Sequence, residues 1–254
     1  MTNGTETMVK IKWVFTPADF LEEKISLERE GYAVEIDNGE IWARMAESRF
    51  EAQPGIREMI AAELDAYFLG INLSRRKPFG IQGGTIIRIF PNGHTDTTLT
   101  VQGVTAHVHL GDVDLTIVDN DGRVHDTRRN RIEAAKRIAR LSVKHGGNPT
   151  LRKILTSYYN SVKDPSNELV YLYEIWEALK RELGKKADKA IGVQSQYRKR
   201  LEKLACKNLI QGRHRGRFLR LRDATPEELN EARAIAQDMI TKFLAYLEAP
   251  QPKP

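Results

Sequence analysis

The stretch 32-YAVEIDNGEIWARM-45 decides the fold class of the first half of the chain. Apolar and polar residues alternate through 32–36 and again through 40–45, which is typical of strands with one buried face. Asp37-Asn38-Gly39 stands between them, and residues of these types readily adopt the backbone conformation of a tight hairpin turn. The stretch therefore predicts an antiparallel hairpin and, with it, an antiparallel sheet.

Further strands and two helices are predicted around this hairpin. Strand patterns occupy 9–15, 84–90, 97–110 and 113–119, and a turn at 120–122 leads into a short strand at 123–127. A helix is predicted at 17–30, because Thr16 can cap it and Pro17 suits a first helical position. A second helix begins at Pro54 and has its apolar residues on one face. We therefore expect residues 1–126 to form an α+β domain with a mainly antiparallel sheet.

The second half is predicted to be all-helical. Helical apolar spacing occurs in 128–145, 151–162, 168–183, 185–205 and 226–247. The last helix has the clearest start, since Thr225, Pro226 and Glu228 match the N-cap, first position and third position of a capping box. The expected fold class is thus α+β, with two or three helices beside the N-terminal sheet and an all-helical domain at 127–254.

Charge separates the two predicted domains. Residues 1–126 hold 12 Lys and Arg against 20 Asp and Glu, a net charge of −8, whereas residues 127–254 hold 28 against 14, a net charge of +14. The basic half is suited to a polyanion such as nucleic acid. The alternative is that the acidic and basic halves attract each other, within one molecule or between two.

Composition also narrows the compartment. The single cysteine, Cys206, excludes an intramolecular disulfide, and the chain starts with a polar stretch and lacks a run of 18 apolar residues. We expect a cytoplasmic protein without a membrane partner. The glycine-rich stretch 80-GIQGGT-85 lacks the Lys-Ser/Thr pair of a phosphate-binding loop, and no cofactor is expected.

The strongest candidate for polyanion binding is the basic segment from Lys207 to Arg222. Gly212 and Gly216 bracket part of it, and glycines let a backbone approach a phosphate closely. Arginines supply planar, bidentate phosphate donors. The predicted nucleic-acid contacts are Arg213, Arg215, Arg217, Arg220 and Arg222, with a stripe on helix 128–145 made of Arg129, Lys136, Arg140 and Lys144. The alternatives are an ordinary solvated surface and pairing of these cations with acids of the protein itself.

The same region carries 207-KNLIQGRH-214, after a long helix and before the last one. This pattern resembles the motif of the HEPN family, bacterial and archaeal helical domains of which many cleave RNA and form dimers. In that family Arg is followed by four to six residues and then His, and Asn often follows the Arg. Here Lys207 stands in place of the Arg, and Asn208 and His214 match the Asn and His. The resemblance covers about residues 128–248.

The resemblance implies RNA binding, a homodimer and a setting in prokaryotic stress or phage defence. Chemically, a histidine beside cations can act as general acid or base in a metal-independent attack by a ribose 2′-hydroxyl. The candidate catalytic residues are His214, Lys207 and Asn208. Because Lys207 replaces the family's Arg, we expect weak or absent ribonuclease activity with RNA binding retained.

Two other patterns point to different sites. In 185–205, Ile191-Gly192-Val193 is suited to a turn between two short helices, and residues 194–199 then lead a DNA-recognition helix. The alternative there is an ordinary helical hairpin. His107 and His109 fall on one strand face, a spacing that can chelate a metal, but no third ligand follows at a diagnostic distance. We therefore expect an exposed strand face and no metal.

The favoured hypothesis from these patterns is a cytoplasmic RNA-binding protein. One rival is a DNA-binding regulator that uses residues 185–205. The other is a self-assembling interaction protein driven by its acidic and basic halves. A binder of nucleic acid should lose affinity steeply as salt rises, because phosphate contacts release counterions.

Overall fold

The computed structural model of this chain describes residues 6–98, 116–118, 124–206, 209–212 and 221–249. The fold is α+β, as the sequence predicts, with an antiparallel sheet followed by helices. The chain divides into two compact units, Met1–Asp65 with Phe79–Val113 and Ala66–Pro78 with Asp114–Pro254. We call them the sheet unit and the helical unit. The sequence predicts a single domain boundary between residues 126 and 127. The two units do not follow it, because Ala66–Pro78 and the residues from Asp114 onward belong to the helical unit.

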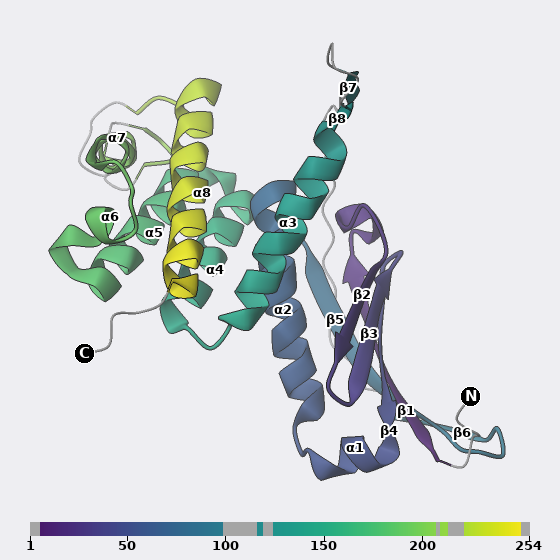
Figure 1. Cartoon of the computed structure of the whole chain (residues 1–254). Coiled ribbons are helices and arrows are strands. Elements are labelled where there is room, and N and C mark those ends of the chain that lie inside the picture. Colours follow the sequence, from purple (N-terminus) through teal and green to yellow (C-terminus); the bar gives the residue numbers. More distant parts are fainter. Residues whose placement is uncertain (1–5, 99–115, 119–123, 207–208, 213–220, 250–254) are drawn as a thin grey trace. The chain divides into compact units, whose positions relative to one another are not determined.

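The described part of the sheet unit contains a six-stranded sheet (Figure 1). Its strands are β1 (Met8–Thr16), β2 (Ile25–Arg29), β3 (Tyr32–Asp37), β4 (Glu40–Ala46), β5 (Gly80–Ile89) and β6 (Thr95–Thr98). Their order is β2-β3-β4-β1-β5-β6, and each neighbouring pair is antiparallel. The predicted hairpin is confirmed, because β3 pairs with β4 through a turn in which Asn38 and Gly39 have φ angles of 45° and 83°.

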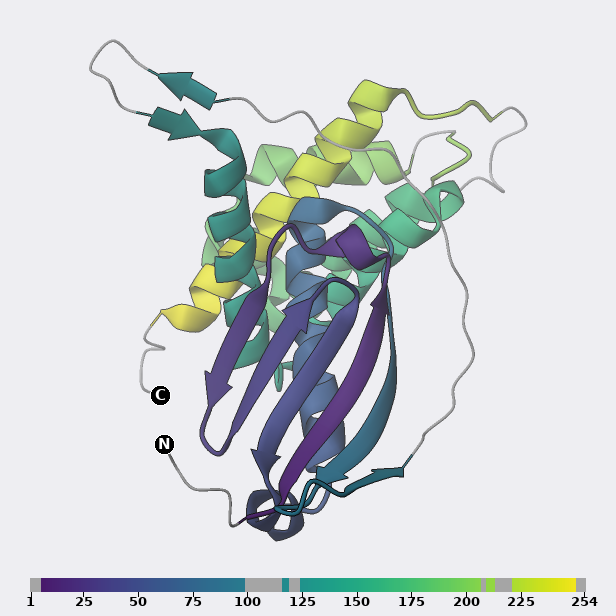
Figure 2. The same cartoon turned by 90° about the vertical axis from the view of Figure 1, so that its right-hand side faces the viewer.

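One face of this sheet forms the core of the sheet unit. Alternate residues are buried, namely Val9, Ile11, Trp13 and Phe15 on β1, Val34 and Ile36 on β3, and Ile41, Ala43 and Met45 on β4. The first part of helix α2 (Ile56–Arg75) belongs to the same unit, lies along the sheet and buries Ile56, Ile60 and Leu64 (Figure 2). The two-residue period of the strands and the four-residue spacing of the helix therefore supply the two sides of one core.

The prediction of a helix at 17–30 is wrong. The structure has a 3-10 turn, η1 (Ala18–Phe20), followed by β2, which pairs with β3. Ile25 and Leu27 are buried, whereas the residue between them and the two after them are exposed, so the segment follows the period of a strand. Hydrogen bonding to β3 and burial of two side chains outweigh the local helix-start signal.

Smaller differences concern the ends of elements. Helix α1 (Glu47–Ala52) was not predicted, and β5 begins at Gly80 rather than at residue 84. Of the strand predicted at 97–110, only the part up to residue 98 lies within the described residues. The antiparallel pairing of β7 (Thr116–Val118) with β8 (Val124–Asp126) confirms the pair predicted at 113–119 and 123–127.

The helical unit contains each helix that the sequence predicts for the second half (Figure 1). They are α3 (Thr127–Lys144), α4 (Pro149–Lys163), α5 (Glu168–Leu183), α6 (Ala187–Ala190), α7 (Ser195–Ala205) and α8 (Pro226–Glu248). Helix α5 packs against α4, α7 and α8. The predicted capping box starts α8, since the Thr225 hydroxyl accepts from the Glu228 amide and the Glu228 side chain accepts from the Thr225 amide. No described helix is both long and apolar enough to cross a membrane.

The second part of α2 belongs to the helical unit and lies in backbone contact with α3. A Cβ atom added at Gly70 would come 2.6 Å from the Cα of Ala139 and 2.8 Å from the Oγ of Ser142. Ala139 and Ser142 are fully buried on the predicted apolar side of α3. Only a residue without a side chain allows this approach, so Gly70 sets the distance between the two helices.

Candidate functional site

Residues 187–205 fold as two helices joined by a tight turn. Helix α6 ends at Ala190, and Gly192 then adopts a left-handed φ of 72° that favours glycine. Ile191 and Val193 on either side of it are buried, and α7 begins at Ser195. The turn predicted at Ile191-Gly192-Val193 is confirmed, although α6 is a single turn that follows a 3-10 turn, η3 (Gly184–Lys186).

Asp188 of α6 holds this turn together. Its carboxylate accepts from the Ser195 hydroxyl at 2.7 Å and from the Lys189 amide at 2.9 Å, and its backbone carbonyl accepts from the Val193 amide at 2.8 Å. The hydrogen bond from Ser195 is the main cause that holds the pKa of Asp188 below the ordinary aspartate value. One acidic side chain therefore contacts the first helix and the start of the second.

The arginines of α7 are held by groups of the helical unit itself. Arg200 makes a bidentate pair with Glu231 of α8, at 2.8 Å and 2.7 Å, which raises the pKa of Arg200. Arg198 lies 3.3 Å from Glu202 and 3.7 Å from Asp188, and its guanidinium stands over the ring of Trp176 at 5.5 Å. These two cations contribute to packing between helices rather than to an open surface.

The lysines of the same helix face solvent. Gln196, Lys199 and Lys203 follow each other at i, i+3 and i+7, and all three are exposed. Neither lysine forms an ion pair with a described residue. Tyr197, in the first turn of α7, is 40% exposed. We call Gln196, Lys199 and Lys203 the α7 face; Tyr197 follows Gln196 directly in the chain and therefore lies on a different side of the helix.

Most of the predicted basic segment lies outside the described residues. This applies to the candidate catalytic residues and to four of the predicted phosphate contacts, namely Lys207, Asn208, His214, Arg213, Arg215, Arg217 and Arg220. Residues 209–212 and 221–222 of the segment are described, and a β-bridge joins Leu209 to Arg222. Arg222 makes a bidentate pair with Glu228 of α8, at 2.8 Å and 2.9 Å, so its guanidinium already has a carboxylate partner.

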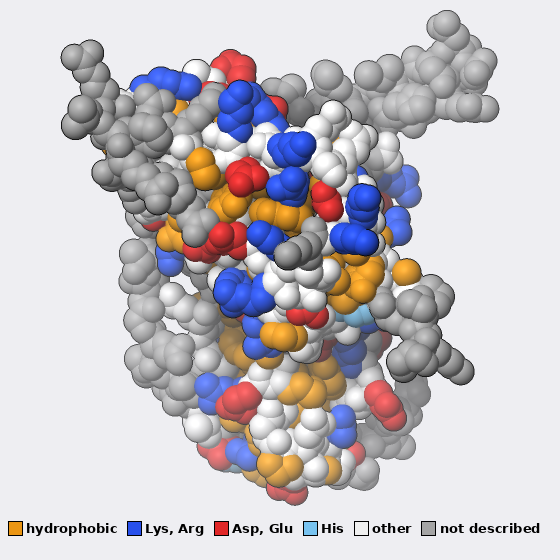
Figure 3. Space-filling view, turned by 90° about the vertical axis from the view of Figure 1, so that its left-hand side faces the viewer, with side chains coloured by type: hydrophobic (Ala, Val, Ile, Leu, Met, Phe, Trp, Pro, Cys, Tyr) orange, Lys and Arg blue, Asp and Glu red, His pale blue; other side chains and the backbone are white. Residues whose placement is uncertain are grey.

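The four cations predicted to form a stripe on α3 differ in exposure and in pairing. Arg129 and Arg140 are exposed, as predicted. Lys136 lies 3.4 Å from Glu133, and Lys144 lies 2.7 Å from Glu248 at the end of α8. Figure 3 shows the wider pattern on one face, where Lys and Arg side chains are interspersed with Asp and Glu. The charge on that face is therefore mixed rather than uniformly positive.

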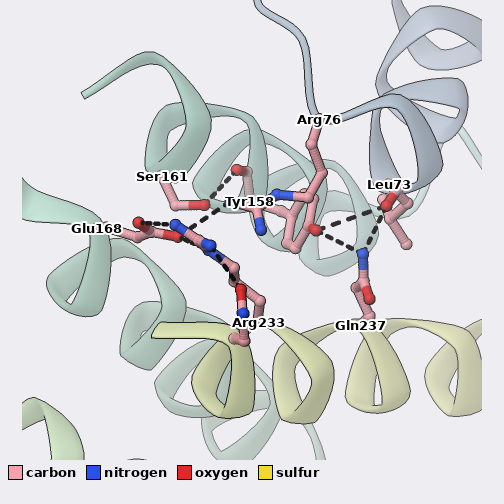
Figure 4. Close-up of polar contacts among 8 residues, drawn as sticks. Leu73, Arg76, Tyr158, Ser161, Glu168, Arg233 and Gln237 are labelled. Carbon is pink, nitrogen blue, oxygen red and sulfur yellow. Dashed lines mark hydrogen bonds and ion pairs between the residues drawn. The ribbon is translucent and has the colours of Figure 1, made fainter. Parts of the chain in front are cut away.

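Sequence reasoning missed a buried polar cluster in the helical unit (Figure 4). Glu168, at the start of α5, is 1% exposed and pairs with Arg233 of α8 at 2.8 Å and with Arg76 at 3.1 Å. Gln237 of α8 donates to the Tyr158 hydroxyl and to the Leu73 carbonyl, both at 2.7 Å. The cluster thus joins α4, α5 and α8 to the C-terminal end of α2.

The chemistry of this cluster suits a structural role. Two guanidiniums flank one carboxylate, and the hydrogen bonds that Arg233 donates to Glu168 raise the pKa of Arg233. Burial raises the pKa of the Tyr158 hydroxyl, which keeps it neutral. No local spacing in the sequence announces this arrangement, because residues 76, 168 and 233 come from three distant segments.

The described residues do not provide a metal site. They contain no group of three His, Cys, Asp or Glu side chains placed to hold an ion. His107 and His109 lie outside the described part of the chain.

A cavity of about 480 Å³ lies beside the start of α4, lined by Gly146, Gly147, Pro149, Arg152, Lys153, Thr156 and Ser157. The Ser157 hydroxyl in its wall already donates to Glu174, at 3.1 Å.

No family model, curated protein or solved structure matches this chain. The resemblance of the helical half to HEPN domains stays a prediction from the sequence. The function is therefore argued from the arrangement of the described side chains.

Proposed function

We propose that this protein binds nucleic acid, RNA in preference to DNA, through its helical unit. The observation that carries the proposal is the α7 face. It combines two exposed lysines, without ion-pair partners among the described residues, with an exposed glutamine on one side of the helix, and the 40% exposed Tyr197 lies in the first turn of the same helix. Lysines can contact phosphates, a glutamine amide can contact base edges, and a tyrosine ring can stack on an unpaired base.

The sorting of cations on α7 supports this use of the face. Arg198 and Arg200 are paired with carboxylates, whereas Lys199 and Lys203 point to solvent. A lysine without a carboxylate partner can release counterions from a phosphate backbone without first breaking an ion pair. The available charge of α7 is therefore concentrated on the side that also carries Gln196.

The preference for RNA rests on two considerations. Stacking on Tyr197 requires a base that is not held in a duplex, which is common in RNA loops and single strands. The resemblance of 207-KNLIQGRH-214 to the HEPN motif points the same way. The proposal includes a homodimer acting in prokaryotic stress or phage defence, with weak or absent ribonuclease activity because Lys207 stands where that family has Arg.

A DNA-binding regulator is the second candidate, and one observation favours it. Residues 187–205 form a helix, a tight turn and a second helix whose first residues are exposed. Duplex readers of this type place the start of the second helix against base edges in the major groove. Gln194 and Gln196 then take the position of base contacts, and Lys199 that of a phosphate contact.

The test compares three nucleic acids and two matched double variants. Wild-type protein is titrated with single-stranded RNA, hairpin RNA and duplex DNA at 50 and 200 mM salt. The variant Lys199→Ala/Lys203→Ala removes the two lysines of the α7 face. The control Lys153→Ala/Lys163→Ala removes two exposed lysines from α4 and changes the net charge by the same amount.

We expect RNA to bind most tightly. The α7 variant should reduce the steepness of the plot of log affinity against log salt by about 1.4, because each lysine that no longer neutralises a phosphate of a single strand removes roughly 0.7. The α4 variant should leave that slope near the wild-type value. Undetectable binding of all three ligands at 50 mM salt refutes the proposal. Tighter binding of duplex DNA than of RNA, with the same reduction in the α7 variant, selects the second candidate.

A further inference from the structure

Asp188 stands out as an acid within the element proposed to bind a polyanion. The residue is 8% exposed, and it lies in the first turn of α6. A negative charge close to a phosphate site weakens binding by repulsion. Its presence there needs a compensating role.

The contacts of Asp188 describe such a role. Gln194, the residue at the N-cap position of α7, makes no side-chain capping bond, and the first α7 residue, Ser195, is instead held by the Asp188 carboxylate at 2.7 Å. The same carboxylate faces Arg198, whose guanidinium lies over Trp176 of the packed helix α5. The direction in which α7 leaves the turn therefore depends on Asp188.

We propose that Asp188 is a positioning residue for nucleic-acid binding, which fixes the start of α7 so that Lys199 and Lys203 reach phosphates together. This inference rests on the proposed function, and it assigns Asp188 no direct contact with the ligand. Two phosphate contacts from one helix require a fixed helix direction, because a tilt of α7 moves its second lysine away from the backbone that its first lysine contacts.

The proposal makes a prediction whose sign differs from that of simple electrostatics. Removing a negative charge near a polyanion site should strengthen binding if charge alone matters. If Asp188 positions α7, its removal should weaken binding although the protein becomes more positive. Asp188→Asn keeps an oxygen that can accept from Ser195, so this variant should bind better than Asp188→Ala.

The experiment measures RNA affinity and its salt dependence for wild type, Asp188→Ala, Asp188→Asn and Ser195→Ala. Ser195→Ala removes the hydrogen bond without changing the charge. Glu202→Gln is the matched control, because it removes a negative charge from α7 that is 47% exposed and takes no part in the turn. Far-UV circular dichroism and thermal unfolding establish that each variant is folded at the assay temperature.

At a slope of about 0.7 per phosphate, each lysine contact contributes roughly threefold in affinity at 200 mM salt relative to a 1 M reference, so loss of both contacts lowers affinity about tenfold at 200 mM salt. We expect Asp188→Ala to bind about tenfold more weakly with a lower salt slope, Ser195→Ala to share this effect, and Glu202→Gln to bind at least as tightly as wild type. RNA affinity of Asp188→Ala equal to or tighter than that of wild type overturns the inference. If Asp188→Ala does not fold, the same result for Ser195→Ala overturns it. Absence of RNA binding by the wild-type protein overturns the proposed function itself.

Discussion

Replacing Gly70 by alanine tests the backbone contact between α2 and α3. The new Cβ atom would lie 2.6 Å from the Cα of Ala139, 2.8 Å from the Oγ of Ser142 and 3.0 Å from the Ala139 amide nitrogen. Carbon atoms in van der Waals contact are about 3.5–4.0 Å apart. Helix α3 therefore has to move by about 1 Å, and two of the three atoms belong to its backbone and cannot rotate away.

Two opposing terms set the magnitude. Overpacking of a close-packed interior costs about 1–3 kcal/mol. Alanine is favoured over glycine within a helix by about 0.8–1.0 kcal/mol. The steric term is at the upper end of its range, because the contact is with backbone, so we expect Gly70→Ala to lower the free energy of unfolding by about 1–2 kcal/mol.

Urea unfolding followed by far-UV circular dichroism and by tryptophan fluorescence measures this change. Trp176 is buried in the helical unit, which contains both helices of the contact. Gly147→Ala is the control, because no atom lies within 4 Å of its added Cβ, and it should change stability by less than about 0.5 kcal/mol. A Gly70→Ala protein that is as stable as wild type, or more stable, refutes the reasoning, since helix propensity alone predicts that result.

Three further outcomes follow from the described side-chain interactions. Glu168→Gln leaves two guanidiniums without their carboxylate and should lower the free energy of unfolding in urea by about 2–3 kcal/mol. This is less than for a fully buried pair, because both arginines reach solvent. The control Asp238→Asn breaks an exposed pair and should lower it by under about 0.5 kcal/mol. Thr225→Ala removes the cap of α8 and should cost about 1 kcal/mol, against little change for Thr156→Ala at an exposed position of α4. The pKa of Asp188 is lowered in the folded state, so its contribution to stability is present above the unfolded pKa of about 3.9 and is lost as pH falls through the folded value. The difference in melting temperature between wild type and Asp188→Asn should accordingly shrink towards zero as pH falls below the folded pKa of Asp188.

Local signals account for most of the fold that the sequence predicts. The hairpin turn at Asn38-Gly39 and the capping box at Thr225 each depend on residues a few positions apart, and both are present. The helix predicted at 17–30 fails because its local signal competes with a partner strand from elsewhere in the sheet. Strand pairing is a property of the whole sheet, which a cap residue and a proline do not report.

The candidate site divides in the same way. The turn at Gly192 is a local feature and was predicted, together with an exposed start of the second helix. Which cations of α7 stay available was not predictable, because Arg200 finds its carboxylate on Glu231 of α8, in a different part of the chain. Sequence composition favoured arginines as phosphate contacts, whereas the lysines of α7 are the cations that stay exposed on that helix.

The path of the chain between the two units has a practical consequence for dissecting the protein. Ala66–Pro78 belongs to the helical unit, although the sheet unit resumes directly after it. A fragment ending near residue 126 would separate Ala66–Pro78, with the buried Tyr67 and Phe68, from the rest of the helical unit. A fragment starting near residue 127 would lack the Leu73 carbonyl that Gln237 binds and the Arg76 that pairs with Glu168. Expression of either half alone should therefore yield aggregated or unfolded material, and work on the helical unit needs the intact polypeptide.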